Sequence, residues 1–144
     1  MKLEEIYTEW DKDSDIDTTD LGTESIKIPK LHNKYYKLYT SEKLLLRKYE
    51  AEMKSLKLVK YEFYTQGPSA ETKDLGWEMP SKGMILKQEM PMYMEGDREI
   101  IALSLKIGLQ QEKVELLESI IKSLVNRGFQ IKSAIDWHKF TMGA

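Results

Sequence analysis

The sequence of 144 residues predicts a mainly α protein, built as a long-helix hairpin or coiled-coil-like subunit that assembles into a homo-oligomer. Two long stretches, residues 30–65 and 98–127, carry apolar side chains at alternating steps of three and four residues, which is typical of amphipathic helices. Between them, residues 66–97 contain four glycines and three prolines and therefore predict an irregular segment. We expect a single domain over residues 1–144, because typical domains hold roughly 100–200 residues.

The composition excludes several classes of site and protein. The chain has no cysteine and only two histidines, so disulfides, thiolate nucleophiles, zinc bound by cysteine and three-histidine metal sites are excluded. No apolar stretch approaches the ~20 residues that a membrane helix needs, and the polar, acidic start Met1–Ile6 is no secretory signal. We expect a soluble intracellular protein that needs no cofactor and does not contact membranes.

Residues 1–28 form an acidic N-terminal segment with short helices, the first over residues 2–10. The alternating aspartates of residues 11–17 imitate the start of a calcium loop, but they lack the glycine and glutamate that such a loop requires at its sixth and twelfth positions. A hydrated turn is the better interpretation. We expect Thr18 or Thr19 to cap a second short helix that runs to about Ile28, and Pro29 to lie in the first turn of the next helix.

Residues 30–65 are predicted to form one long basic helix, which Gly67 and Pro68 end. A helix of this length extends about 54 Å, whereas a compact globule of this chain length would be only about 37 Å across. The helix must therefore pair with another long helix or with another chain. Its heptad seam contains two glutamates and consists of Leu31, Tyr35, Leu38, Glu42, Leu45, Tyr49, Glu52, Leu56, Val59 and Phe63.

Residues 66–97 are expected to be an irregular connector. Residues 84–86 are a candidate short strand. The three methionines of residues 89–94 suit either an adaptable contact surface or gap filling beneath the helices.

Residues 98–140 are predicted to hold the oligomerisation helices. Gln110 is the single polar residue in the first seam and can set its register. A second apolar stripe contains Ile101, Leu105, Leu109, Leu116 and Ile120. Two stripes are more than one partner helix covers, so self-association is expected. The residues assigned to oligomerisation are Ile100, Leu103, Ile107, Val114, Leu117, Ile121 and Leu124.

The last part of this region is expected to form a separate helix. Asn126–Gly128 is interpreted as the C-terminal cap of the preceding helix, with Arg127 at its negative end. The final helix would then fold back and pack its aromatic side chains, among them Phe129, Trp137 and Phe140.

The charge distribution suggests nucleic-acid binding. Residues 1–24 have a net charge of −7, from two lysines and nine acids, whereas residues 25–60 have +7, from ten basic and three acidic residues. Cations that follow phosphates, together with flat rings that stack on bases, bind single strands without sequence preference. The candidate binding residues are Arg47, Lys54, Lys57, Lys60, Tyr61 and Tyr64. The alternative is an ordinary solvated helix face whose lysines balance the acidic segment.

Two other classes of function compete with this interpretation. A structural or adaptor helical homo-oligomer would use the same heptads without binding DNA. An enzyme would need a clustered acid, base or nucleophile, and only His138, between Trp137 and Lys139 and near Asp136, comes close. Adjacent residues on a helix do not face each other, so we expect no enzymatic activity.

Two segments resemble the UvsY family of phage recombination mediators. They are the basic and aromatic run Leu56–Gly67 and the tail Ile120–Phe140, which contains the Arg-Gly-Phe-x-Ile-Lys pattern of residues 127–132. The order of elements also agrees, from a short acidic start through a long basic helix and an irregular middle to an apolar helix. The resemblance covers most of the chain and is weakest over residues 66–97.

The resemblance implies a non-enzymatic mediator that forms a ring-like homo-oligomer, a hexamer or heptamer, and binds single-stranded DNA. Such a protein loads the phage recombinase onto strands covered by the phage single-strand-binding protein. It would act in homologous recombination, repair and recombination-dependent replication, in the cytoplasm of the infected bacterial host. The family's DNA contacts carry over to Lys57, Lys60 and Tyr64, although two residues separate these lysines where the family pattern has one; Arg47 and Lys54 are added from helix spacing alone.

Overall fold

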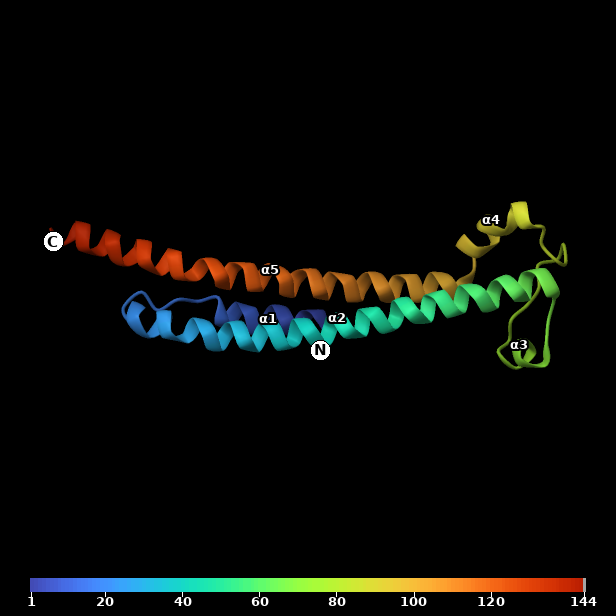
Figure 1. The fold of residues 1–144 in the computed structure, drawn as a ribbon, viewed down its shortest axis with the longest axis horizontal. Helices are drawn as coiled ribbons and strands as arrows, with labels where there is room; N and C mark the ends of the chain where they lie inside the picture. The colour runs from blue at the N-terminus through green and yellow to red at the C-terminus, as the bar shows by residue number, and fades with distance from the viewer. Residues whose placement is uncertain (144) are drawn as a thin grey trace. The chain divides into compact units, whose positions relative to one another are not determined.

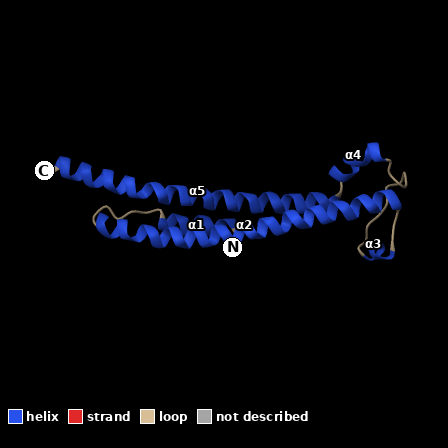
Figure 2. Cartoon of the chain, in the orientation of Figure 1, coloured by secondary structure: helices blue, strands red, loops and turns tan. Residues whose placement is uncertain are grey.

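The computed structural model describes residues 1–143 and confirms a mainly α chain (Figure 1). No strand occurs within these residues (Figure 2), so the strand predicted at residues 84–86 is wrong. Ile85 is buried and its N–H donates to the Tyr64 carbonyl at 2.9 Å, but no second extended segment pairs with it. The elements in chain order are α1 (Leu3–Asp13), α2 (Leu21–Gln66), α3 (Ala70–Asp74), the 3₁₀ helix η1 (Lys87–Glu89), α4 (Met90–Glu95) and α5 (Arg98–Thr141).

The helix α2 begins nine residues earlier than predicted and absorbs the expected second short helix. Asp20, rather than Thr18 or Thr19, precedes its first turn, and the Asp20 carboxylate accepts from the Thr23 N–H at 3.3 Å. Pro29 lies inside α2 and not in its first turn. Proline is unfavourable inside a helix because it removes one i→i−4 hydrogen bond. The N-terminal cap at Asp20 stabilises the helical turns that precede Pro29.

The helix α5 also continues beyond its predicted end. Gly128 lies inside it without a positive φ, so residues 126–128 are not a C-terminal cap. The Arg127 guanidinium contacts the carbonyls of Asp13 and Ser14, at 2.9 and 3.2 Å, instead of the end of its own helix. Consequently the final aromatic side chains do not fold back, and the exposed ones are Phe129, Trp137 and Phe140.

The connector between α2 and α5 consists of short helical pieces, of which α3 is capped by side chains. Ser69 and Thr72 form reciprocal capping contacts around α3, which ends before Gly76 with its positive φ. The methionines divide between the two predicted roles, because Met90 is buried and fills space while Met92 is exposed.

The chain divides into two compact units, Met1–Leu44 with Gln110–Ala144, and Leu45–Leu109. We call them the first unit and the second unit. The single-domain assignment stays a prediction. In the first unit, α1, α2 and α5 share a core of Ile6, Tyr35, Leu117, Ile120 and Leu124. In the second unit, the end of α2 packs against the connector through Phe63, Tyr64, Ile85 and Met90.

In each unit α2 and α5 are antiparallel. In the first unit Gln110 of α5 contacts Glu42 of α2, and Leu117, later in α5, packs in the same cluster as Tyr35, earlier in α2. In the second unit the Lys106 ammonium lies 4.3 Å from the centre of the Tyr49 ring, and Lys60 pairs with Glu99. The hairpin pairing that the length of the basic helix predicts is therefore present in both units.

Candidate nucleic-acid interface

Three of the predicted cations form an exposed row on the part of α2 that belongs to the second unit. Arg47, Lys54 and Lys57 are all exposed, and none forms an ion pair within the described residues. Successive members are seven and three residues apart, so they share one face of the helix. Tyr61, four residues beyond Lys57, continues this face and is 40% exposed. We call these four residues the cationic row.

One acid interrupts the cationic row. Glu50 lies between Arg47 and Lys54 at helical spacing and is exposed. The row therefore carries three positive charges against one negative charge. It keeps a positive excess and one flat ring, which are the two features that non-specific binding of single strands requires.

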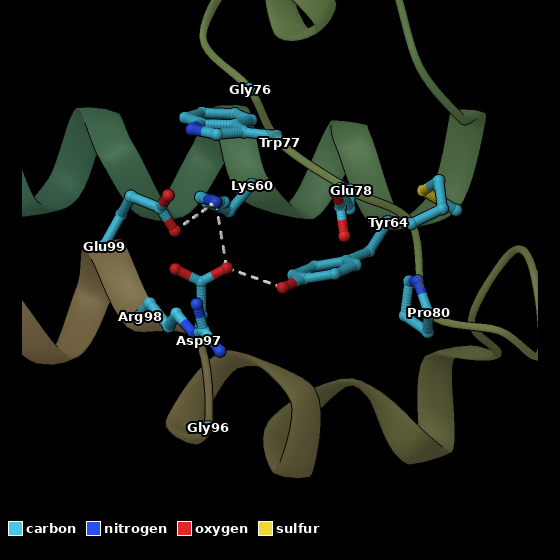
Figure 3. Close-up of a pocket in the computed structure, with 11 residues that line it drawn as sticks. Lys60, Tyr64, Gly76, Trp77, Glu78, Pro80, Gly96, Asp97, Arg98 and Glu99 are labelled. Atoms are coloured by element: carbon cyan, nitrogen blue, oxygen red, sulfur yellow. Dashed lines mark hydrogen bonds and ion pairs between the residues drawn. The ribbon is translucent and has the colours of Figure 1, made fainter.

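Lys60 is placed differently from the cations of the row. Its residue is only 2% exposed, and its ammonium contacts the Asp97 carboxylate at 3.0 Å and the Glu99 carboxylate at 2.9 Å (Figure 3). The indole of Trp77 lies across the same ammonium, with its ring centre 3.7 Å away. Two carboxylates and an aromatic face together replace the water that a lysine normally holds.

Tyr64 lies one turn further along α2 and faces the same carboxylate. Its hydroxyl donates to Asp97 Oδ2 at 2.5 Å, and burial followed by this hydrogen bond raises the pKa of the Tyr64 phenol (Figure 3). The other Asp97 oxygen accepts from the Ile100 N–H at 3.0 Å and so caps α5. Burial alone would raise the pKa of Asp97, but the hydrogen bonds from Tyr64, Ile100 and Lys60 outweigh it and hold that pKa below its usual range.

A cleft of about 430 Å³ borders this arrangement. Its walls come from three parts of the second unit: α2, the connector around Trp77 and the start of α5 (Figure 3). We call Lys60, Tyr64, Trp77, Asp97 and Glu99 the Lys60 cluster. Because its one ammonium is shared by two carboxylates, the cluster joins parts of the fold and offers no free cation to a phosphate.

The structure therefore separates the six predicted binding residues into two groups. Arg47, Lys54, Lys57 and Tyr61 are exposed on one helix face, whereas Lys60 and Tyr64 are buried with partners from the same chain. The buried pair has almost no surface for phosphates or bases in this conformation. The exposed residues are the ones that the geometry leaves available to DNA.

Comparison with protein families gives a match over residues 9–144, to the family described as "Recombination, repair and ssDNA binding protein UvsY". The chain belongs to the UvsY family. Comparison with curated proteins gives no match.

Solved structures of the UvsY family share this fold. Three crystal structures of the recombination mediator protein UvsY of bacteriophage T4 are similar to this chain, in lattice types II, IV and I. They are 22%, 21% and 21% identical to it, with TM-scores of 0.84, 0.79 and 0.82. The matches cover 99%, 98% and 95% of this chain, and 98%, 99% and 98% of the respective crystal chains.

The residues assigned to oligomerisation lie mostly inside this UvsY-family chain. Ile100, Val114, Leu117 and Leu124 are buried within their own units, while Leu103, Ile107 and Ile121 are half-buried. Of the second predicted stripe, Ile101, Leu105 and Leu109 are exposed, whereas Leu116 is half-buried and Ile120 is buried. A role of the first seam between chains stays untested.

Sequence reasoning missed the acidic and aromatic partners of Lys60. Asp97 immediately precedes a predicted helix and thus had the signal of an N-cap, but nothing in the sequence connected it with a lysine 37 positions earlier. Trp77 carried no periodic signal because it lies in the connector. In the first unit a similar arrangement was missed, in which Asp13 accepts from the Lys34 ammonium and the Tyr35 hydroxyl, both at 2.7 Å.

Within residues 1–143 no three histidine or acidic side chains gather in a group that could hold a metal ion. None of the helices there combines the length and apolar character needed to cross a bilayer.

Proposed function

We propose that this chain is a recombination mediator that binds single-stranded DNA and promotes loading of the phage recombinase onto strands covered by the phage single-strand-binding protein. Membership of the UvsY family over residues 9–144 is the observation that carries this proposal. The setting is homologous recombination, repair and recombination-dependent replication in the cytoplasm of the infected bacterial host.

The cationic row is the proposed DNA contact of the second unit. Its three cations have no acidic partners of their own within the described chain, so phosphates can take that place without breaking ion pairs. Tyr61 offers a ring to one base, and such stacking is insensitive to sequence. The proposed contact therefore holds any single strand, as loading along a whole strand requires.

Self-association makes a weak contact effective. We propose a ring-like homo-oligomer, a hexamer or heptamer, in which every subunit presents its own cationic row. Linked contacts on one strand reinforce one another because each binding event raises the local concentration for the next. DNA that bends across several subunits would hold the covering protein less firmly and become accessible to the recombinase. The chain has no P-loop motif, so the energy for this exchange comes from binding.

A titration with a labelled single strand at several salt concentrations tests the proposed contact. For single strands the slope of log affinity against log salt is about −0.7 per neutralised phosphate. Replacing Arg47, Lys54 and Lys57 by glutamine should flatten that slope by up to about 2 for each engaged subunit. A matched control replaces three exposed lysines of α5, Lys122, Lys132 and Lys139, and should leave the slope nearly unchanged.

The same titration separates the mediator from the adaptor that the sequence also allows. A structural helical oligomer without DNA binding would show no salt-dependent binding even at low ionic strength. Equal slopes for the wild type and the Arg47, Lys54 and Lys57 variant would instead reject the cationic row while leaving another DNA contact open.

Loading is tested by a second measurement. The recombinase is added to a strand covered by labelled single-strand-binding protein, and release of the label is followed over time. The wild-type chain should shorten the delay before release, and the cationic-row variant should not. An unchanged delay with wild-type chain would reject the mediator role.

A further inference from the structure

A second aromatic and cationic feature lies on the part of α2 that belongs to the first unit. His32, Tyr36 and Tyr39 are four and three residues apart, so they follow one another along one helix face. The rings of His32 and Tyr36 are stacked, with centres 5.9 Å apart and planes 13° from parallel. The Tyr36 and Tyr39 ring centres are 6.0 Å apart. We call these three rings the aromatic strip.

Core packing does not explain the central ring of the aromatic strip, Tyr36. The neighbouring Tyr35 is fully buried in the core of the first unit, and Tyr39 packs partly against that core. Tyr36, in contrast, is 53% exposed and belongs to none of the buried clusters of the described chain. Contact with His32 and Tyr39 on either side fixes the ring while much of its surface remains open.

Cations without acidic partners border the aromatic strip. The Lys43 ammonium lies 5.3 Å from the centre of the Tyr39 ring and donates to its hydroxyl at 3.2 Å. Lys37 follows Tyr36 in sequence, so it projects from the adjoining face of α2, where it is exposed. Neither lysine forms an ion pair within residues 1–143, whereas Lys34 is paired with Glu9 and Asp13 on the side that faces α1.

We propose that the aromatic strip is a base-stacking site for single-stranded nucleic acid, with Tyr36 as the ring that receives a base and Lys43 and Lys37 as contacts to the adjoining phosphates. An ordered, exposed ring loses little freedom when a base stacks on it, and unpaired cations beside it match the charge of the backbone. The proposal rests on the proposed function and adds a second contact, in the first unit, to the cationic row of the second.

The test compares three variants of the full chain. Tyr36→Ala removes the ring, Tyr36→Phe keeps it without the hydroxyl, and Tyr7→Ala removes a tyrosine of α1 with nearly equal exposure, 51%. Each is titrated with a fluorescent oligothymidylate and with an abasic oligonucleotide of the same length, which has phosphates but no bases. Circular dichroism and sedimentation accompany each titration.

Tyr36→Ala should weaken binding of oligothymidylate by about 5- to 140-fold for one lost stack. It should leave binding of the abasic strand nearly unchanged, and Tyr36→Phe and Tyr7→Ala should bind both strands like the wild type. If Tyr36→Ala loses helicity, Tyr36→Leu is tested in its place. We expect it to bind oligothymidylate more weakly and the abasic strand like the wild type.

Three results would overturn the inference while leaving the proposed function intact. The first is unchanged binding of both strands by Tyr36→Ala, and the second is equal weakening of the binding of both strands. The third is a change in subunit number that accounts for the lost binding, which would make the aromatic strip a contact between copies of the chain. Failure of the wild type to bind any single strand would instead reject the proposed function itself.

Discussion

At the scale of single residues, Lys60 shows that a lysine in a basic helix need not be exposed to solvent. Two carboxylates and an indole surround its ammonium, and the three groups come from two separate parts of the second unit. A buried ion pair often contributes little net stability compared with apolar side chains of the same volume. Removing one partner, however, leaves the others buried without compensation, which makes Lys60 sensitive to substitution.

We expect Lys60→Ala to lower the free energy of unfolding by about 3–5 kcal/mol, because Asp97 would remain buried and charged without its lysine. The matched variant is Lys57→Ala, one turn earlier and exposed, which should change it by no more than about 0.5 kcal/mol. Urea unfolding followed by circular dichroism measures both. Equal stability of the two variants would contradict the buried placement of Lys60.

The ionisation of Asp97 predicts a pH dependence. A carboxyl group whose pKa is lower in the folded state binds protons more readily when unfolded, so its stabilisation is complete above the unfolded pKa of about 3.9 and is lost as the pH falls through the folded value. The wild type should therefore lose more stability between pH 6 and pH 3 than Asp97→Asn does. Parallel stability curves for the two proteins would show that Asp97 is not held in its charged form by the fold.

At the scale of elements, Glu42 and Gln110 explain how a seam with polar residues is tolerated. Both are buried, and the Gln110 amide donates to the carboxylate of Glu42 at 2.6 Å and to its carbonyl at 2.7 Å. The two buried polar residues of the predicted seams are thus paired with each other, while the third, Glu52, is exposed. A slip of either helix by one turn would separate them, so the pair specifies the register of α2 against α5 in the first unit.

Gln110→Leu should lower the free energy of unfolding by about 1–3 kcal/mol, because it leaves the Glu42 carboxylate without its amide donor. The double variant Glu42→Leu with Gln110→Leu should recover most of that loss, since both polar groups are then absent. Thermal or urea unfolding of the wild type, Gln110→Leu, Glu42→Leu and the double variant completes the double-mutant cycle. Simple additivity of the two single effects would contradict a direct interaction.

The heptad pattern predicted the buried face of α5 well and that of α2 only in part. Ile100, Val114, Leu117 and Leu124 of the predicted seam are already buried in the single chain, and Gln110 lies among them. In α2, the predicted Glu52 and Val59 are exposed, and the neighbouring Met53 and Lys60 take the inward positions. A pattern that favours apolar residues at buried positions selects Val59 over Lys60. Lys60 is buried because Asp97 and Glu99, which are distant in sequence, pair with its ammonium.

Helix ends were predicted less well, because local signals compete with tertiary contacts. Pro29 and the Asn-Arg-Gly sequence at residues 126–128 both resemble helix boundaries, yet each lies inside a helix. Arg127 is committed to the first residues after α1, and this contact is available only if α5 continues in its helical direction. A local pattern contains no information about such a partner more than a hundred residues away.

Gly128→Ala should stabilise the chain by about 0.5–1 kcal/mol, because alanine favours a helix interior and the added methyl group meets no atom within 4 Å. The opposite sign is expected if Gly128 ended a helix in the left-handed conformation, as its sequence context suggests. The midpoint of thermal unfolding distinguishes the two signs.

At the scale of the whole molecule, the two units repeat one chemical arrangement. Each holds a tyrosine hydroxyl and a lysine ammonium of α2 on one aspartate: Tyr35 and Lys34 on Asp13, and Tyr64 and Lys60 on Asp97. Asp13 is the last residue of α1, and Asp97 immediately precedes α5. The sequence groups Lys60 with the exposed cations of α2, because charge alone does not reveal which lysines form ion pairs inside a fold.

Self-association is predicted to use the apolar residues that α5 leaves exposed in the second unit. Replacing Ile101 and Leu105 by glutamine should reduce the mass measured by sedimentation and leave helicity unchanged, because Leu105 is 71% exposed in the single chain. Gln111→Glu, also exposed on α5, is the control and should keep the wild-type mass. Wild-type mass in the double variant would place the contact elsewhere.

The indole rings have a practical consequence. Trp77 faces a cation in the second unit, and Trp10 lies edge-on to Tyr35 and 5.4 Å from the Arg127 guanidinium in the first. Once the exposed Trp137 is replaced by phenylalanine, each unit contains a single tryptophan whose emission depends on a nearby positive charge. Replacing one of these two as well leaves a single indole, so the opening of each unit can be followed by tryptophan emission without attaching a dye.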